Sequence, residues 1–233
     1  MNNIVVIGSC NMDITVMADK RPAAGETIMG LGLNISPGGK GANQAVASAK
    51  LGAHVTMVGC IGDDAYGRMV LDNLHKYNIN TDYLTVIEGE NSGTAHITLA
   101  EGDNSIIVIA GANAKVDSKV VDNAWDAIKT ADLVLVQNEI PLSTIGYITE
   151  KCAKNGIKVL LNPAPAADLD SAWLEAATYI TPNEHELAAL YPGQATEDTM
   201  LANEGKIIVT LGKQGVAYAK DGKVHTVPGF TVT

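Results

Sequence analysis

The chain has 233 residues, of which 46% are hydrophobic and 18% are charged, and its formal net charge is −10 at pH 7. This length supports one substantial core without disulfides or metals, and the composition argues against long disordered segments. The acidity and the lack of clustered Lys and Arg disfavour a nucleic-acid partner, and no apolar run is long enough to span a membrane.

The three cysteines, Cys10, Cys60 and Cys152, are odd in number and lie far apart in apolar stretches. This usage is typical of reduced thiols and not of a disulfide framework, and no metal-site spacing links them. The first residues lack the basic and apolar segments of a secretory signal. We therefore expect a cytoplasmic protein.

Short apolar runs predict strands that are buried on both faces, as in a parallel sheet. They lie at 4–7, 54–58, 133–137, 158–161 and 207–210, and helical patterns lie between them at 42–51, 66–77, 118–129, 144–154 and 184–190. This alternation predicts an α/β fold with a doubly wound, mostly parallel sheet flanked by helices. We expect residues 1–233 to belong to one such domain.

Two pairs of strands interrupt the alternation. Residues 13–18 with 27–35, and 94–99 with 105–110 across a turn at 102–104, have the pattern of antiparallel hairpins. We expect a small antiparallel β lid, inserted at about 13–36 and 93–110, with one face packed because apolar residues alternate along 94–99. In the alternative, these hairpins extend the core sheet. A further hairpin is predicted at 215–220 and 223–227.

A glycine-rich turn at 36–44 (SPGGKGANQ) opens a helix after a strand. Its glycines allow a ligand to approach the backbone, and the helix start supplies free N–H donors. The four-residue gap of a P-loop is absent. Lys40 and Asn43 lie one helical turn apart, which suits them to bond adjacent hydroxyls of a polyol. A helix cap with a solvated lysine is the alternative.

Two carboxylates follow predicted core strands: Asp13 comes after the first strand, and Glu139 after the strand at 133–137. Open α/β sheets bind ligands at the carboxyl ends of their strands, so both are expected on one rim with Lys40 and Asn43. Together they predict a pocket that selects a sugar by its hydroxyl pattern. Taken singly, Asp13 could instead form a turn or cap, and Glu139 could lie on the surface.

In their joint order, these motifs resemble those of the ribokinase or PfkB family of carbohydrate kinases. The resemblance spans nearly the whole chain and is carried by Gly8 to Asp13, Pro22 with Gly25-Glu26-Thr27, Gly38 to Ala45, Gly62-Asp63-Asp64, Gly111-Ala112-Asn113, Asn162 to Ala166, Thr181 to Glu184 and Thr210-Leu211-Gly212. It implies an α/β core with a small β lid that often forms the dimer contact. It also implies ATP-dependent phosphoryl transfer to the 5-hydroxyl of ribose.

The resemblance further implies roles for single residues. The sugar contacts fall on Asn11, Asp13, Gly39, Lys40, Asn43 and Glu139. Asn183 and Glu186 match an Asn-x-x-Glu element associated with the phosphates and Mg²⁺, and the nucleotide-binding turn falls on Thr210, Leu211, Gly212, Lys213, Gln214 and Gly215. The implied cofactors are ATP and Mg²⁺, and a monovalent cation such as K⁺ is a further candidate.

The spacing of Asn183 and Glu186 near a helix start suits a hydrated Mg²⁺, because it sets an amide and a carboxylate side by side. An ordinary capping arrangement of the same two residues is the alternative.

The sequence departs from the family pattern in two places on the nucleotide side of the predicted site. The catalytic Gly-Ala-Gly-Asp turn would follow a strand at 227–233, so we expect its Asp beyond Thr233, the C-terminal part of the domain to be missing, and this chain to be inactive alone. Residues 190–206 replace a longer helix and retain only a pattern at 197–204.

Two other functions stay open. The first is a sister kinase for deoxyribose, another sugar or a nucleoside, although a chain with one Phe, two Trp and seven Tyr, none of them in the turn at 36–44, offers little to stack on a base. The second is a non-catalytic sugar-binding protein, which would keep the pocket without the catalytic turn.

Overall fold

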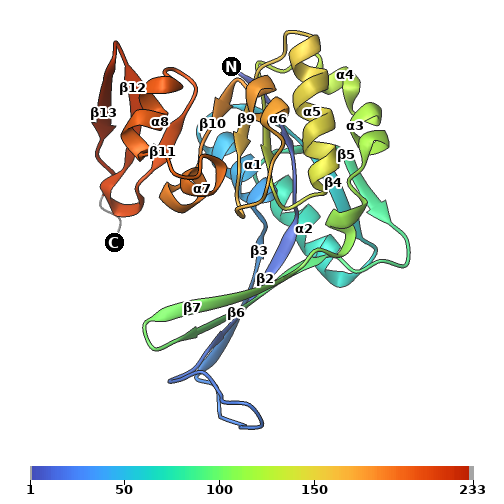
Figure 1. Ribbon diagram of the computed structural model, residues 1–233. Helices are drawn as coiled ribbons and strands as arrows, with labels where there is room; N and C mark the ends of the chain where they lie inside the picture. The colour runs from blue at the N-terminus through green and yellow to red at the C-terminus, as the bar shows by residue number, and fades with distance from the viewer. Residues whose placement is uncertain (1, 231–233) are drawn as a thin grey trace.

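The computed structural model describes residues 2–230 and confirms the predicted α/β fold. Its centre is a parallel six-stranded sheet with the strand order β10-β9-β8-β1-β4-β5 (Figure 1). The strands are β1 (Asn3–Ile7), β4 (His54–Gly62), β5 (Asn80–Ile87), β8 (Leu133–Gln137), β9 (Val159–Asn162) and β10 (Tyr179–Ile180).

Helices cover both faces of this sheet, which is why its inner strands are apolar at consecutive positions. On β1, Val5 and Ile7 pack toward one hydrophobic cluster while Val6 packs toward the other. The second cluster includes α1 (Lys40–Lys50) and α2 (Ala65–Lys76). The first includes residues of α3 (Ser118–Asn123), α4 (Trp125–Ile128), α5 (Leu142–Lys154), α6 (Ser171–Ala176), α7 (Glu184–Leu190) and α8 (Thr196–Ala202).

The two interrupting hairpins join into one four-stranded sheet that projects from the core (Figure 1). It contains β2 (Asn11–Met17), β3 (Gly32–Gly38), β6 (Gly93–Ala100) and β7 (Asp103–Ile109) in the order β3-β2-β6-β7. Both hairpins are antiparallel, as predicted, but they meet through the parallel pair β2 and β6, so the sheet is mixed. We call it the projecting sheet.

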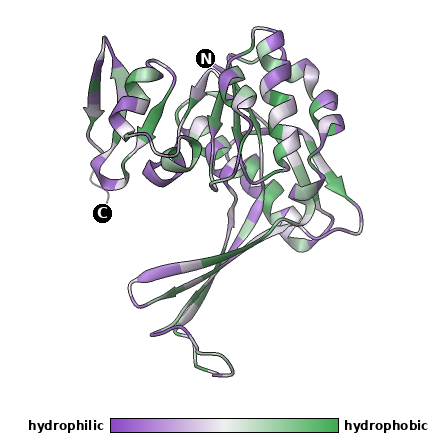
Figure 2. Cartoon of the chain, viewed as in Figure 1, coloured by the Kyte–Doolittle hydropathy of each residue, from purple (hydrophilic) through white to green (hydrophobic). Residues whose placement is uncertain are grey.

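The packed face that we expected along 94–99 is present only near the core. Ala95 is buried, Ile97 is half-buried and Leu99 is exposed, and every residue of β7 is exposed. Figure 2 shows apolar ribbon along the projecting strands, well away from the helices. The outer part of this sheet therefore carries apolar side chains that nothing among residues 2–230 covers.

A third, antiparallel sheet consists of β11 (Ile208–Thr210), β12 (Val216–Lys220) and β13 (Lys223–Val227). The prediction that 207–210 is a strand of the parallel core was therefore wrong in its sheet assignment. Among the described residues, two isolated parallel bridges, Ile180 to Ile207 and Asn183 to Thr210, are the β contacts that connect this segment to the end of the main sheet. β13 ends at Val227, and the last part of the strand expected at 227–233 lies outside the described residues.

Other differences from the prediction have local causes. The edge strand β5 has a single buried residue, Leu84, so it lacks the continuous apolar run that marks the inner strands. The helix expected at 118–129 is divided at Ala124, where α3 ends and α4 begins. Short 3₁₀ helices lie at η1 (Gly111–Lys115) and η2 (Gly212–Gln214). Within residues 2–230, no helix combines the length and apolar character that a membrane span requires.

Candidate functional site

The six residues assigned to the sugar line one cavity of about 340 Å³ between the core and the projecting sheet. Asn11 and Asp13 come from β2, and Glu139 follows β8. Gly39 is the N-cap of α1, and Lys40 and Asn43 lie in the first turn of that helix. The gathering follows from topology, since β1 and β8 are neighbouring parallel strands whose carboxyl ends meet at one rim.

The rest of the cavity wall is apolar, and we did not assign it from the sequence. It consists of Ala95, Ile97, Ile106, Val108 and Pro165. β6 and β7 supply the first four, and Ala95 pairs with Val108 and Ile97 with Ile106 across the hairpin. The alternation along 94–99 carried the signal, because residues at every second position of a strand share a face. That face is turned to a ligand cavity and not to a protein core.

Gly39 joins β3 to α1 in a backbone conformation that favours glycine. Its φ is 88°, and a Cβ at this position would lie 2.7 Å from the backbone nitrogen of Asn11. A side chain would therefore push β2 away from the helix start. The glycine brings Asn11, Lys40 and Asn43 to the same wall of the cavity.

The backbone donors at the start of α1 are already engaged, which corrects the expectation that they are free for a ligand. Oε2 of Glu139 accepts from the backbone nitrogen of Lys40 at 3.0 Å and from Oγ of Ser9 at 2.6 Å. Gly41 donates to Oγ of Ser9 at 3.2 Å, and Ala42 donates to the Ser9 carbonyl at 2.9 Å. Glu139 thus caps a helix 99 residues earlier in the chain, and its other oxygen, Oε1, is the one left for a ligand.

Burial raises the pKa of the Asp13 carboxyl above its usual value, and the nearby charge of Glu139 raises it further. The two carboxylates line the same cavity, so the charge of Glu139 disfavours the ionised form of Asp13. A cavity with two carboxylate acceptors suits a ligand that brings several hydroxyl donors, and its negative charge is balanced by a cation of the protein in the same wall. Lys40 supplies that cation.

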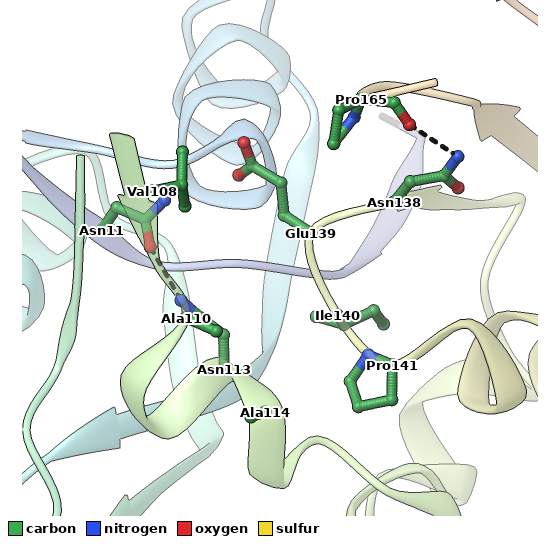
Figure 3. Close-up of a pocket in the computed structure, with 10 residues that line it drawn as sticks. All are labelled: Asn11, Val108, Ala110, Asn113, Ala114, Asn138, Glu139, Ile140, Pro141 and Pro165. Atoms are coloured by element: carbon green, nitrogen blue, oxygen red, sulfur yellow. Dashed lines mark hydrogen bonds between the residues drawn. The ribbon is translucent and has the colours of Figure 1, made fainter. Parts of the chain in front are cut away.

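A second cavity of about 350 Å³ adjoins the first and shares Asn11, Val108, Glu139 and Pro165 with it (Figure 3). Its own part is formed by Ala110, Asn113, Ala114, Asn138, Ile140 and Pro141. In Figure 3, Nδ2 of Asn138 donates to the carbonyl of Pro165 at 3.0 Å, and Asn113 lies against Asn11.

A line of side-chain amides connects this region to the neighbouring strands. Nε2 of Gln137 donates to Oε1 of Gln44 at 2.7 Å, and Nε2 of Gln44 donates to Oδ1 of Asn162 at 3.2 Å. Nδ2 of Asn162 then donates to the carbonyl of Thr181 at 2.8 Å. The line therefore runs from β8 through α1 and β9 to the segment that leads into Asn183.

The residues assigned to the nucleotide form a separate group, which lines neither of the two cavities. Asn183 caps α7 in a capping box, because Oδ1 of Asn183 accepts from the Glu186 nitrogen and Oε2 of Glu186 accepts from the Asn183 nitrogen, both at 2.8 Å. The capping alternative considered for this pair is thus present. Thr210, which bridges to Asn183, begins the turn formed with Leu211, Gly212, Lys213, Gln214 and Gly215.

The chain is similar in sequence to known kinases that act on sugars. The profile of the family described as pfkB family carbohydrate kinase matches residues 1–233. A ribokinase of Bacillus subtilis (strain 168) is 48% identical over 232 residues, which cover 100% of this chain and 79% of that protein. A deoxyribokinase of Salmonella typhi is 38% identical over 242 residues, covering 99% of this chain and 79% of that protein. The chain belongs to the pfkB family of carbohydrate kinases.

A solved structure agrees with this assignment in three dimensions. The ribokinase of Arabidopsis thaliana, complexed with ribose and ATP, superimposes with a TM-score of 0.86 at 31% identity, over 97% of this chain and 78% of that one.

Proposed function

We propose that the protein transfers a phosphoryl group from ATP to the 5-hydroxyl of D-ribose. The observation that carries the proposal is the cavity that collects two carboxylates, one lysine and two asparagines from three distant segments of the chain. The B. subtilis ribokinase that is 48% identical over this whole chain supports the choice of sugar.

The cavity residues divide into donors and acceptors that match a polyol. Asp13 and Oε1 of Glu139 accept from sugar hydroxyls, while Lys40 and Asn43 donate to sugar oxygens. The apolar wall from β6 and β7 lies against the carbon atoms of the ring. A sugar without one of these hydroxyls leaves a polar group of the cavity unpaired, and such sites reject it by up to about 10⁴-fold.

The capping box of α7 and the turn that starts at Thr210 are proposed to hold ATP. The bridge between Asn183 and Thr210 supports this assignment because it brings both segments to one place. Magnesium fits the donor set, since the Glu186 carboxylate and the Asn183 amide are oxygen ligands of the kind it prefers. Among residues 2–230 no three His, Cys, Asp or Glu gather as a metal cluster. The proposed contact of Glu186 with Mg²⁺ is through water. When bound, the ion would neutralise phosphate charge. A role for K⁺ stays a prediction without assigned ligands.

The direct test measures ADP release by the complete gene product with D-ribose, 2-deoxyribose, fructose and adenosine, comparing kcat/KM. We expect ribose to give the highest value. A higher value for 2-deoxyribose would favour the sister activity, which the 38% identity to a deoxyribokinase makes the second candidate. Ribose binding by calorimetry with no ADP release would instead favour a sugar-binding protein.

We also propose that the protein is a homodimer through the projecting sheet. The face turned away from the cavity carries Leu33 and Ile107, which are 62% and 70% exposed, with Val16, Ile35 and Ile109 also exposed. Two copies related by a two-fold axis would match these apolar faces to each other and remove both from water. Within residues 2–230 no other element covers them.

Ile107→Lys should therefore convert the dimer to a monomer in light scattering coupled to size-exclusion chromatography, because the interface would bury an unpaired ammonium group. Val86→Lys is the matched control, since Val86 is 51% exposed on β5, at the edge of the main sheet. A monomeric wild-type protein, or a dimer that survives Ile107→Lys unchanged, would refute the arrangement.

A cytoplasmic location is proposed from the thiols. Cys10, Cys60 and Cys152 are all buried and free in the part of the chain that the structure describes. Burial raises the pKa of Cys10 to about 12 and those of Cys60 and Cys152 to about 11. Inert, unpaired thiols of this kind are typical of a reducing compartment.

A further inference from the structure

Asn113 of η1 is buried, and the backbone of Cys10 fixes the orientation of its amide. Oδ1 of Asn113 accepts from the Cys10 nitrogen at 2.9 Å, and Nδ2 donates to the Cys10 carbonyl at 3.2 Å. A backbone N–H can only donate and a carbonyl can only accept. The two ends of the Asn113 amide are therefore distinguished by the backbone itself.

The fixed orientation of Asn113 passes to Asn11. The second hydrogen on Nδ2 of Asn113 goes to Oδ1 of Asn11 at 2.7 Å, and Asn11 is itself buried where the two cavities meet. The oxygen of Asn11 is thus occupied, and in Figure 3 its nitrogen points away from Asn113. The end of the Asn11 amide that is left for a ligand is the donor, Nδ2.

Gly93 gives independent support, because it leaves room for this hydrogen bond. A Cβ at Gly93 would lie 2.2 Å from Oδ1 of Asn11 and 2.2 Å from Nδ2 of Asn113, which are the two bonded atoms. Any side chain at this position would separate them. Gly93 pairs with Asn11 across the parallel strands β6 and β2, so the contact is built into the sheet.

We propose that Asn113 is a positioning residue that sets Asn11 as a hydrogen-bond donor to a sugar oxygen. The inference rests on the proposed function, since it concerns the same cavity. It has a consequence for specificity: Asp13 and Glu139 are acceptors, so a hydroxyl beside them can donate to a carboxylate while it accepts from Asn11. If the Asn11 amide were turned, a third acceptor would face the same hydroxyls.

The test is a double-mutant cycle in the complete gene product with Asn113→Ala, Asn11→Ala and the double variant, measured as KM and kcat for D-ribose and as Tm. Asn113→Ala should raise the KM for ribose by about 3- to 10-fold in the wild-type background. It should have no further effect on KM in the Asn11→Ala background, because there is no amide left to orient. A loss of Tm should persist in the Asn11→Ala background, since the Cys10 backbone loses its partner there as well.

An equal rise in KM in both backgrounds would overturn the proposal, because Asn113 would then act through general structure. Gly93→Ala keeps both asparagines, and it should raise KM like Asn113→Ala. Asn155→Ala, at the exposed end of α5, is the matched control and should leave KM unchanged.

A second measurement separates this inference from the proposed function. In the ligand-free protein, the side-chain amide protons of Asn113 should exchange slowly with solvent by NMR, and faster in Gly93→Ala. Fast exchange in the wild type would overturn the amide orientation even if ribose is the substrate. A wild-type protein that shows slow exchange but neither binds nor phosphorylates ribose would instead refute the proposed function.

Discussion

Asp13→Asn should strongly lower kcat/KM for ribose while making the folded protein more stable at pH 7. The carboxylate is expected to accept from sugar hydroxyls, and an amide can offer only one oxygen and no charge. Lost hydrogen bonds to a charged group correspond to roughly a 10- to 100-fold fall in kcat/KM. The fall in kcat/KM should appear mainly as a higher KM for ribose.

The gain in stability follows from the sign of the pKa shift. Burial, with a contribution from Glu139, raises the pKa of Asp13 in the folded state, so the folded protein binds this proton more tightly than the unfolded chain does. The favourable contribution is therefore complete at low pH and is lost as the pH rises through the raised pKa. At pH 7 the folded state holds an unfavourable charge, and asparagine removes it.

Thermal unfolding at pH 7 and at a pH below the carboxyl range checks this result. The Tm advantage of Asp13→Asn over wild type should be present at pH 7 and should shrink in acid. Asp82→Asn, on the exposed part of β5, is the control and should change neither Tm nor kcat/KM. A lower Tm for Asp13→Asn at pH 7 would contradict the reasoning from burial.

Glu139→Ala should damage both folding and sugar recognition, because this side chain serves two structures at once. Removing it leaves the Lys40 nitrogen and the Ser9 hydroxyl without their acceptor at the start of α1. Unsatisfied groups of this kind cost about 1–3 kcal/mol of unfolding free energy. The sugar loses an acceptor in the same step, so kcat/KM for ribose should fall by roughly 10- to 100-fold.

Graded variants separate the two effects of Glu139. Glu139→Gln keeps one oxygen for the helix start and should retain most of the Tm while losing ribose affinity. Ser9→Ala keeps the Glu139 carboxylate but removes the hydroxyl that donates to its Oε2, so the carboxylate is held less firmly. A modest rise in the KM for ribose is expected. Glu175→Ala, exposed on α6, is the control. If Glu139→Gln unfolds as readily as Glu139→Ala, the helix-capping role is wrong.

The sequence predicted most of the core because its physical signal is local. A strand covered on both faces needs apolar side chains at consecutive positions, which the runs ending at Ile7 and Gln137 display. The edge strand β5 escaped because only Leu84 is buried. The strand at 207–210 was recognised, but which sheet it joins depends on its partner β12, and no pattern within the strand encodes that partner.

The candidate site was predictable to the extent that one rule governs it. Asp13 and Glu139 follow strands whose ends meet at one rim, so their proximity could be inferred without coordinates. The hydrogen bonds that orient Glu139 and Asn11 could not be inferred in this way. Glu139 caps a helix 99 residues away, and Asn113 reaches Asn11 across 102 residues, and neither distance corresponds to a spacing that a motif records.

The position of the cavity has a mechanical consequence. One wall, with Asn11 and Asp13, belongs to the projecting sheet, whereas Glu139 belongs to the core, so a bound sugar cross-links two parts of the molecule. Any motion that swings the sheet outward must first break those bonds. Occupancy by ribose should therefore slow amide exchange along β2 and β6, and the gain in protection should grow with RT ln(1 + [sugar]/Kd).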